Sequence, residues 1–164
     1  MMRIGNGFDV HEIVSGRPLV LGGERIPAEF GLLGHSDADV VLHAVMDAML
    51  GALALGDIGH HFPNTDVRYK DANSMELLRH VVRLVTEQGY RLCNLDVMVL
   101  AEAPKLAPHV MRMRENIAGA CECDVQQVSI KATTMETLGF VGRKEGIAAQ
   151  AVVLLAPLEG VSDK

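Results

Sequence analysis

Apolar residues alternate with polar ones, or run almost without interruption, in several short segments that predict β-strands. The segments are residues 3–11, 19–21, 25–26, 95–99, 128–132 and 147–155. The two shortest flank Gly22-Gly23 and predict a hairpin. The last is an apolar run typical of a strand buried on both faces. We therefore expect Ala148–Leu155 to be covered by another subunit or, alternatively, by a loop or helix of the same chain.

Apolar residues at spacings of three and four predict three helices between these strands. The helices cover residues 36–56, 74–89 and roughly 104–119. Ser36 and Ser74 are expected to cap the first two helices at their N-termini, and Gly56 to end the first. Residues 56–66 are expected to form a loop.

The order of these elements predicts an α+β fold. We expect a two-layer sandwich in which a mixed β-sheet carries its helices on one face. No repeat, low-complexity segment or linker divides the 164 residues, so we expect a single domain at 1–157 and a flexible tail at 158–164. Gly5 and Gly7 in the first strand predict a close approach of another element.

The composition argues against several classes of protein. The net charge is −6 and no basic run interleaves with aromatic residues, so nucleic-acid binding is not expected. No apolar run approaches the roughly 20 residues that span a bilayer, and the N-terminal residues resemble neither a signal peptide nor a transit peptide. Cys93, Cys121 and Cys123 form no disulfide framework or zinc-knuckle spacing. We expect a protein of the reducing cytoplasm that binds no membrane.

Charge is distributed unevenly along the chain. Residues 26–67 contain no Lys or Arg, but they include four of the seven histidines and several carboxylates. Such a stretch attracts a cation, and imidazole favours a metal ion over another chain's Arg. The alternative is an ordinary acidic surface. His60 and His61 stay unassigned here, since either could be a ligand or simply exposed.

Asp9 and His11 are two residues apart in a predicted strand and therefore point to the same face. His43, on the first predicted helix, could complete a set of one carboxylate and two imidazoles. Three protein ligands leave the fourth position of a tetrahedral zinc ion open. The alternative is that Asp9-Val10-His11 is merely polar surface. Asp47, one helical turn after His43, could orient its ring or lie on a solvated face.

Two further segments could contact phosphates or a nucleotide. Lys131–Glu136 ends a strand with two hydroxyls and a carboxylate, and a glycine-punctuated loop with Arg143 follows. Glu136 could hold a hard divalent cation. Ala101–Ala107 leaves a strand and enters a helix, where backbone N–H groups are free. Taken alone, the first segment is better explained by an ordinary turn between strands, and the second by a proline at a helix start.

The motifs resemble a known family when they are taken in order. They are Arg3-Ile4-Gly5, Gly7-Phe8-Asp9-Val10-His11, Ser36-Asp37-Ala38-Asp39-Val40-Val41-Leu42-His43-Ala44, Leu55-Gly56-Asp57-Ile58-Gly59, Phe62-Pro63-Asn64-Thr65-Asp66, Ala103-Pro104-Lys105, Lys131-Ala132-Thr133-Thr134 with Glu136, and Leu138-Gly139-Phe140. Together they resemble the 2-C-methyl-D-erythritol 2,4-cyclodiphosphate synthase family. Glu102 stands where Gln is frequent in that family, and Met135 where Thr is usual.

The resemblance implies a phosphorus–oxygen lyase of non-mevalonate isoprenoid (terpenoid) biosynthesis. The implied substrate is 4-diphosphocytidyl-2-C-methyl-D-erythritol 2-phosphate, whose 2-phosphate attacks its own diphosphate and releases CMP. A metal-dependent phosphohydrolase using the same residues, and a non-catalytic trimeric binding protein, are the alternatives. The retention of the ligand set argues against a degenerate site.

The resemblance also implies a role for individual residues. Asp9, His11 and His43 would hold zinc (Zn²⁺), Glu136 a magnesium or manganese ion, and His35 and Thr134 would steady the transition state. The implied substrate-binding residues are Asp9, Val10, His11, His35, Ser36, Asp57, Ile58, Gly59, Phe62, Pro63, Asn64, Thr65, Asp66, Ala101, Glu102, Ala103, Pro104, Lys105, Leu106, Ala107, Thr133, Thr134, Met135, Glu136, Phe140 and Arg143.

The resemblance further implies a homotrimer with its sheets packed around the threefold axis. The active sites would lie between adjacent subunits, with the metal ligands and the cytidine segment contributed by neighbouring chains. Some members pair the Arg matching Arg143 with a Glu, but here Gln150 occupies that position. We therefore expect Arg143 to be free to face an anion.

Overall fold

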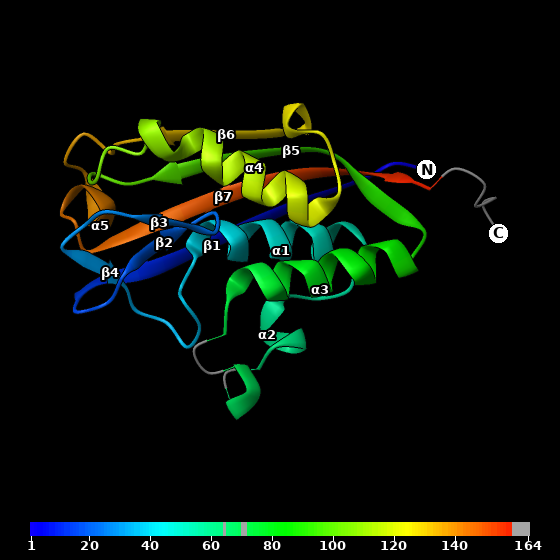
Figure 1. Ribbon diagram of the computed structural model, residues 1–164, viewed down its shortest axis with the longest axis horizontal. Helices are drawn as coiled ribbons and strands as arrows, with labels where there is room; N and C mark the ends of the chain where they lie inside the picture. The colour runs from blue at the N-terminus through cyan, green and yellow to red at the C-terminus, as the bar shows by residue number, and fades with distance from the viewer. Residues whose placement is uncertain (64, 70–71, 159–164) are drawn as a thin grey trace.

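A computed structural model describes residues 1–63, 65–69 and 72–158 of the chain. Figure 1 labels its strands, its α-helices and, among the short helices, α2 and α5. The elements are β1 (Arg3–Ser15), β2 (Leu19–Leu21), β3 (Glu24–Ile26), β4 (Phe30–Leu32), α1 (Val40–Ala52), α2 (Ile58–His61), the 3-10 turn η1 (Val67–Tyr69), α3 (Ser74–Glu87), β5 (Tyr90–Leu100), η2 (Ala107–His109), α4 (Val110–Cys121), η3 (Val125–Gln127), β6 (Val128–Thr133), α5 (Gly139–Gly142) and β7 (Gly146–Pro157).

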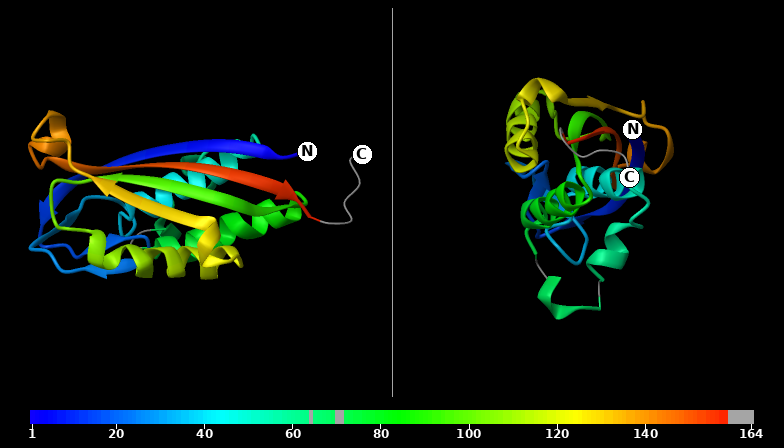
Figure 2. Two further views of the ribbon diagram at one scale, coloured as in Figure 1. Left: turned by 90° about the horizontal axis from the view of Figure 1, so that it is seen from above. Right: turned by 90° about the vertical axis from the view of Figure 1, so that its right-hand side faces the viewer.

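The predicted α+β fold with a mixed sheet is confirmed. Five strands form one sheet in the order β4-β1-β7-β5-β6, and β2 and β3 pair separately as the predicted hairpin. Strands β5 and β6 run parallel, whereas the other neighbours in the large sheet are antiparallel. Helices α1, α3 and α4 cover one face of this sheet (Figure 2).

Helix α1 lies at the centre of the core and packs against β1 and β7. All of its residues are buried except Asp47 and Gly51. The backbone of β1 approaches it so closely that a Cβ at Gly5 would lie 1.9 Å from the Ala48 carbonyl oxygen, and a Cβ at Gly7 2.0 Å from that of Ala44. The predicted close approach at these glycines is confirmed, and it places the middle of β1 beside the first turn of α1.

Several predicted helix ends are wrong. Asp39, not Ser36, caps α1, because its carboxylate accepts a hydrogen bond from the Leu42 N–H at 3.1 Å. The helix ends at Ala52 rather than Gly56, because Ala54 already takes the left-handed conformation at φ +57°. Asn73 caps α3 in place of Ser74.

Other differences concern segment length. Residues 58–61, expected to be part of a loop, form the short helix α2, which Asp57 caps. Helix α4 starts at Val110, after the turn η2, and continues past Gly119 to Cys121. Within the described ranges, no helix combines the length and the apolar character needed to cross a membrane.

The division into one domain at 1–157 and a tail stays a prediction. Leu158 donates its N–H to the Gly89 carbonyl at 2.8 Å, so the first tail residue is tied to the turn before β5. The rest of the predicted tail, residues 159–164, and the predicted substrate contact Asn64 lie outside the described residues.

Candidate active site

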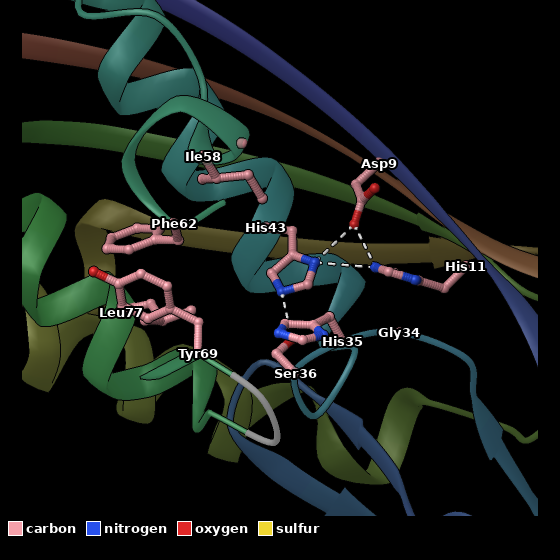
Figure 3. A pocket seen from close by; sticks show the side chains of 11 residues that line it. Asp9, His11, Gly34, His35, Ser36, His43, Ile58, Phe62, Tyr69 and Leu77 are labelled. Carbon is pink, nitrogen blue, oxygen red and sulfur yellow. Dashed lines mark hydrogen bonds and ion pairs between the residues drawn. The ribbon is translucent and has the colours of Figure 1, made fainter. Parts of the chain in front are cut away.

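Asp9 and His11 on β1 meet His43 on the first turn of α1 (Figure 3). The Asp9 Oδ2 atom lies 2.9 Å from His11 Nε2 and 3.0 Å from His43 Nδ1, and the two ring nitrogens are 3.0 Å apart. Three donor atoms within 4.8 Å of one another can hold one metal ion, so the prediction that these residues converge is confirmed. It is the only such group of His, Cys, Asp and Glu among the described residues.

The second nitrogen of each ring is already engaged. The His11 Nδ1 lies 2.7 Å from the Leu33 carbonyl oxygen, which can only accept a hydrogen bond, so Nδ1 carries a proton and Nε2 is the nitrogen that faces Asp9. The His43 Nε2 lies 3.2 Å from the Ser36 hydroxyl and 3.1 Å from the Ser74 hydroxyl. The residues thus fit a metal ion, since one carboxylate oxygen and two imidazole nitrogens face the same point.

The cluster also shifts the ionisation of its members. Burial alone would raise the pKa of Asp9, but the contacts of its carboxylate with the His11 and His43 rings hold that pKa well below its usual range. Burial would lower the pKa of His11, yet its contact with Asp9 outweighs this and raises the pKa. A carboxylate that stays ionised keeps a ligand oxygen available at every ordinary pH.

A cavity of about 240 Å³ opens beside the cluster. Its lining residues are Asp9, His11, Gly34, His35, Ser36, His43, Ile58, Gly59, Phe62, Tyr69 and Leu77. The His35 Nε2 atom is buried there without a hydrogen-bond partner among the described residues. A buried polar nitrogen in that state can donate to or accept from a ligand in the cavity.

The predicted nucleotide segments meet at a second, larger cavity of about 560 Å³. It is lined by Ala101, Glu102, Ala103, Pro104, Lys105, Leu106, Ala107, Val110, Ile130, Lys131, Ala132, Thr133 and Thr134. Strand β5 leads into one segment and β6 into the other, and these strands are parallel neighbours. Their carboxyl ends therefore meet at one edge of the sheet, where α/β folds commonly bind ligands.

Glu102 joins the two segments. Its Oε1 atom accepts hydrogen bonds from the Met135 N–H at 2.7 Å and the Thr137 N–H at 3.4 Å. The turn between them has Glu136 at φ +49° and Thr137 at φ +67°, a left-handed conformation that non-glycine residues seldom adopt. The Thr134 hydroxyl donates to Glu136 Oε1 at 2.5 Å, so Glu136 lies close to the residues at the end of β6.

Several of the other predicted substrate-binding residues do not line either cavity. Asp57 caps α2 and does not line either cavity. Val10 lies between two cluster residues, but its side chain is exposed on the opposite face of β1. Phe140 on α5 lines neither cavity, and Arg143 follows that helix. The expectation that Arg143 is unpaired is wrong, because its Nε lies 2.9 Å from Glu145 Oε1.

Sequence reasoning missed three groups around the cluster. A serine at a helix start is typical of a cap, so nothing local marks Ser74 as a contact of His43. Nor does anything local mark the Leu33 carbonyl, which bonds His11, or Asp37, which accepts from Ser74, because these contacts link segments far apart in the chain. Asp47, which could have oriented His43, instead accepts from the Ile58 N–H at 2.8 Å. His61 bonds the Leu55 carbonyl at 2.9 Å and, like His60, lies outside the cluster.

Comparison with known proteins identifies the family of the chain. The model of the YgbB family matches residues 2–156. The 2-C-methyl-D-erythritol 2,4-cyclodiphosphate synthase of Geobacillus sp. strain WCH70 is 64% identical over 155 residues, which cover 94% of this chain and 98% of that protein. The synthase of Trichlorobacter lovleyi is 60% identical and covers 95% of this chain and 99% of its own.

Solved structures give the same result. The bifunctional IspDF of Campylobacter jejuni matches 96% of this chain at 47% identity with a TM-score of 0.93, and this chain covers 43% of that longer protein. A CDP complex of IspF from Plasmodium falciparum matches 96% of this chain and 97% of its own at 35% identity, with a TM-score of 0.85. The chain therefore belongs to the YgbB family, the family of the 2-C-methyl-D-erythritol 2,4-cyclodiphosphate synthases.

Proposed function

We propose that the chain converts 4-diphosphocytidyl-2-C-methyl-D-erythritol 2-phosphate into 2-C-methyl-D-erythritol 2,4-cyclodiphosphate and CMP. The 2-phosphate attacks the β-phosphorus of the same molecule, and the bond from that phosphorus to CMP breaks. The observation that carries the proposal is the convergence of Asp9, His11 and His43 beside a cavity, in a chain that matches the synthases over nearly its whole length. The reaction serves non-mevalonate isoprenoid biosynthesis.

The physical obstacle in this reaction is charge, not proton transfer. A phosphate is already anionic near neutral pH, whereas two unit charges 4 Å apart repel by about 4 kcal/mol at an effective dielectric constant of about 20. Bound divalent cations offset this repulsion and align the attack. We assign zinc to Asp9, His11 and His43, and a magnesium or manganese ion to Glu136, whose carboxylate suits a hard cation.

The other residues bind and orient the substrate in this proposal. His35, with its unpartnered nitrogen in the first cavity, and Thr134 contact the reacting phosphates. Asp57 takes the methylerythritol hydroxyls from the start of α2. Residues 101–107 and Thr133 hold the cytidine part, which fits the size of the second cavity. The CDP complex of the Plasmodium falciparum relative supports a cytidine nucleotide as the ligand class.

One complete site would combine the two cavities from neighbouring chains of a homotrimer. Within one chain, Asp9 pairs with Ala149, Ala149 with Val99, and Val99 with Ala132, so the cavities lie three strands apart, about 14 Å. Ala149 and Val99 between them are fully buried, which closes the direct path. This separation supports a site shared between subunits.

The uncovered face of the sheet supports the same assembly. Ile4, Phe8, Val10 and Val152 are 72%, 54%, 45% and 39% exposed on the face of the sheet opposite α1, which no helix of the described residues covers. A patch of that kind on one side of a sheet commonly packs against another chain. Gel filtration should give a trimer, and a monomer would contradict the shared site.

Activity is tested by incubating the purified chain with the cytidylyl substrate, zinc and magnesium. We expect CMP to be released in proportion to enzyme. Thr86→Ala, which removes an exposed hydroxyl on α3 that lines neither of the two cavities, is the matched control and should release CMP at the wild-type rate. Absence of CMP release from the folded wild type would contradict the proposed function.

A further inference from the structure

The Ser74 hydroxyl lies between a metal-cluster histidine and a carboxylate. Ser74 is the first residue of α3 and is fully buried. Its Oγ atom is 3.1 Å from His43 Nε2 and donates to Asp37 Oδ1 at 2.5 Å. The other oxygen of Asp37 accepts the Ser74 backbone N–H at 3.0 Å. The hydroxyl and the backbone N–H of Ser74 thus both donate to the carboxylate of Asp37.

This arrangement fixes the direction of the hydrogen bonds that link Asp37, Ser74 and His43. An ionised carboxylate only accepts, so the single hydroxyl proton of Ser74 points to Asp37. The hydroxyl oxygen must then accept from His43, which requires the proton on Nε2. In that form Nδ1 carries no proton, and its lone pair is available to a metal ion bound beside Asp9 Oδ2, which lies 3.0 Å from Nδ1 (Figure 3).

The capping of α3 does not need the Ser74 hydroxyl. The Asn73 side chain accepts from the Met75 N–H at 2.8 Å and fills that role. The Asp37 N–H also donates to the Ala72 carbonyl at 3.1 Å, so the turn that carries Asp37 is tied to the segment just before α3. Two segments 37 residues apart are held together at the back of the His43 ring.

Ser36 is the other hydroxyl near His43, at 3.2 Å from Nε2. It also accepts from the Ala38 N–H at 3.2 Å and contacts no carboxylate in the described part of the chain. Its proton is therefore free to rotate, and Ser36 by itself would permit either form of the imidazole. Only the pair of Ser74 and Asp37 selects one.

We propose that Ser74 and Asp37 are positioning residues for the metal cluster. They hold His43 in the orientation and protonation form in which Nδ1 is a ligand, and they contact neither the metal nor the substrate. This inference rests on the proposed metal role of Asp9, His11 and His43. Partners of this kind behind a ligand histidine typically change metal affinity 10–100-fold when removed.

The test measures metal binding by the full-length protein, independently of activity. Zinc affinity is determined by competition with a chromophoric chelator, and the visible absorption of the cobalt-substituted protein reports the ligand geometry. We expect Ser74→Ala to weaken zinc binding about 10–100-fold and to alter the cobalt spectrum. Ser74→Thr, which keeps the hydroxyl, should restore both, and Thr86→Ala on the same helix should change neither.

Asp37→Asn tests the same inference without removing volume from the core. The backbone N–H and the hydroxyl of Ser74 each donate to one oxygen of Asp37. An amide side chain at this position would have only one oxygen to accept them, so the direction of the Ser74 hydroxyl would no longer be fixed. We expect weaker zinc binding than in the wild type here too, even if Ser74→Ala does not fold.

The outcomes separate the two proposals. Wild-type zinc affinity and an unchanged cobalt spectrum in folded Ser74→Ala or Asp37→Asn would overturn the positioning role alone. A folded wild type that binds neither zinc nor cobalt would overturn the proposed metal role, and the positioning role with it.

Discussion

The two cavities differ in how their polar groups are held. At the metal cluster, each imidazole has its second nitrogen bonded to another group, and His43 is buried. At the second cavity, residues 131–136 are all exposed; the Thr133 hydroxyl bonds to the Thr134 carbonyl, and the Thr134 hydroxyl to Glu136 in the adjoining loop. The first region is organised by the fold itself, whereas the second depends on a loop and on backbone groups.

This difference matches the chemistry each region is proposed to perform. A metal ion requires donor atoms at defined positions before it binds. A nucleotide can be held by many weak contacts, several of them to the backbone, so the loss of one side chain costs less. Substitutions should therefore be severe at the cluster and mild at the second cavity.

The largest effect is expected for His43→Ala. It removes one of three ligands, and we expect kcat/KM to fall about a thousandfold, equivalent to about 4 kcal/mol of transition-state stabilisation. CMP release and zinc content should be measured on the same folded sample. A variant that loses its zinc but keeps its rate would remove the cluster from the mechanism.

The second effect concerns pH. A protonated imidazole cannot bind a metal, and contact with Asp9 raises the pKa of His11 above its ordinary 6.5. Protons therefore compete with zinc from a higher pH than an ordinary histidine would allow, and affinity should fall as the pH drops below that raised pKa. Zinc titrations between about pH 8 and pH 5 would show this, with roughly tenfold weaker binding per unit for each proton taken up. An affinity independent of pH over that range would contradict the assigned ligands.

The smallest effect is expected at Glu102. Removing its carboxylate in Glu102→Ala frees the turn at 135–137, and we expect KM for the cytidylyl substrate to rise about 5–10-fold, or roughly 1–1.4 kcal/mol. Zinc affinity should not change.

Glu102→Gln is the matched control for that substitution. Both backbone N–H groups bond to the same oxygen, Oε1, which an amide oxygen can replace. The Glu102→Gln variant should therefore keep a KM near that of the wild type. A change of zinc affinity in Glu102→Ala would show that the two regions are not independent.

The same contrast explains what the sequence could predict. The alternation that places Asp9 and His11 on one face, the helical position of His43 and the glycines facing α1 are local signals, and each was confirmed. The role of Ser74 depends on Asp37 and His43, which are distant in the chain, and a serine before a helix is equally typical of a cap. The predicted ends of α1 were wrong for a related reason. Asp39 caps the helix in place of Ser36, and Ala54 takes the left-handed conformation that ends it, which was expected of Gly56.

In the proposed reaction one phosphate of the substrate attacks another, and product analysis in oxygen-18 water tests this most directly. Phosphorus NMR of the completed reaction should show one cyclic diphosphate and one CMP per substrate, with no label from water in either product. A linear phosphate carrying the label would mean that water is the attacking group, and it would contradict the cyclisation.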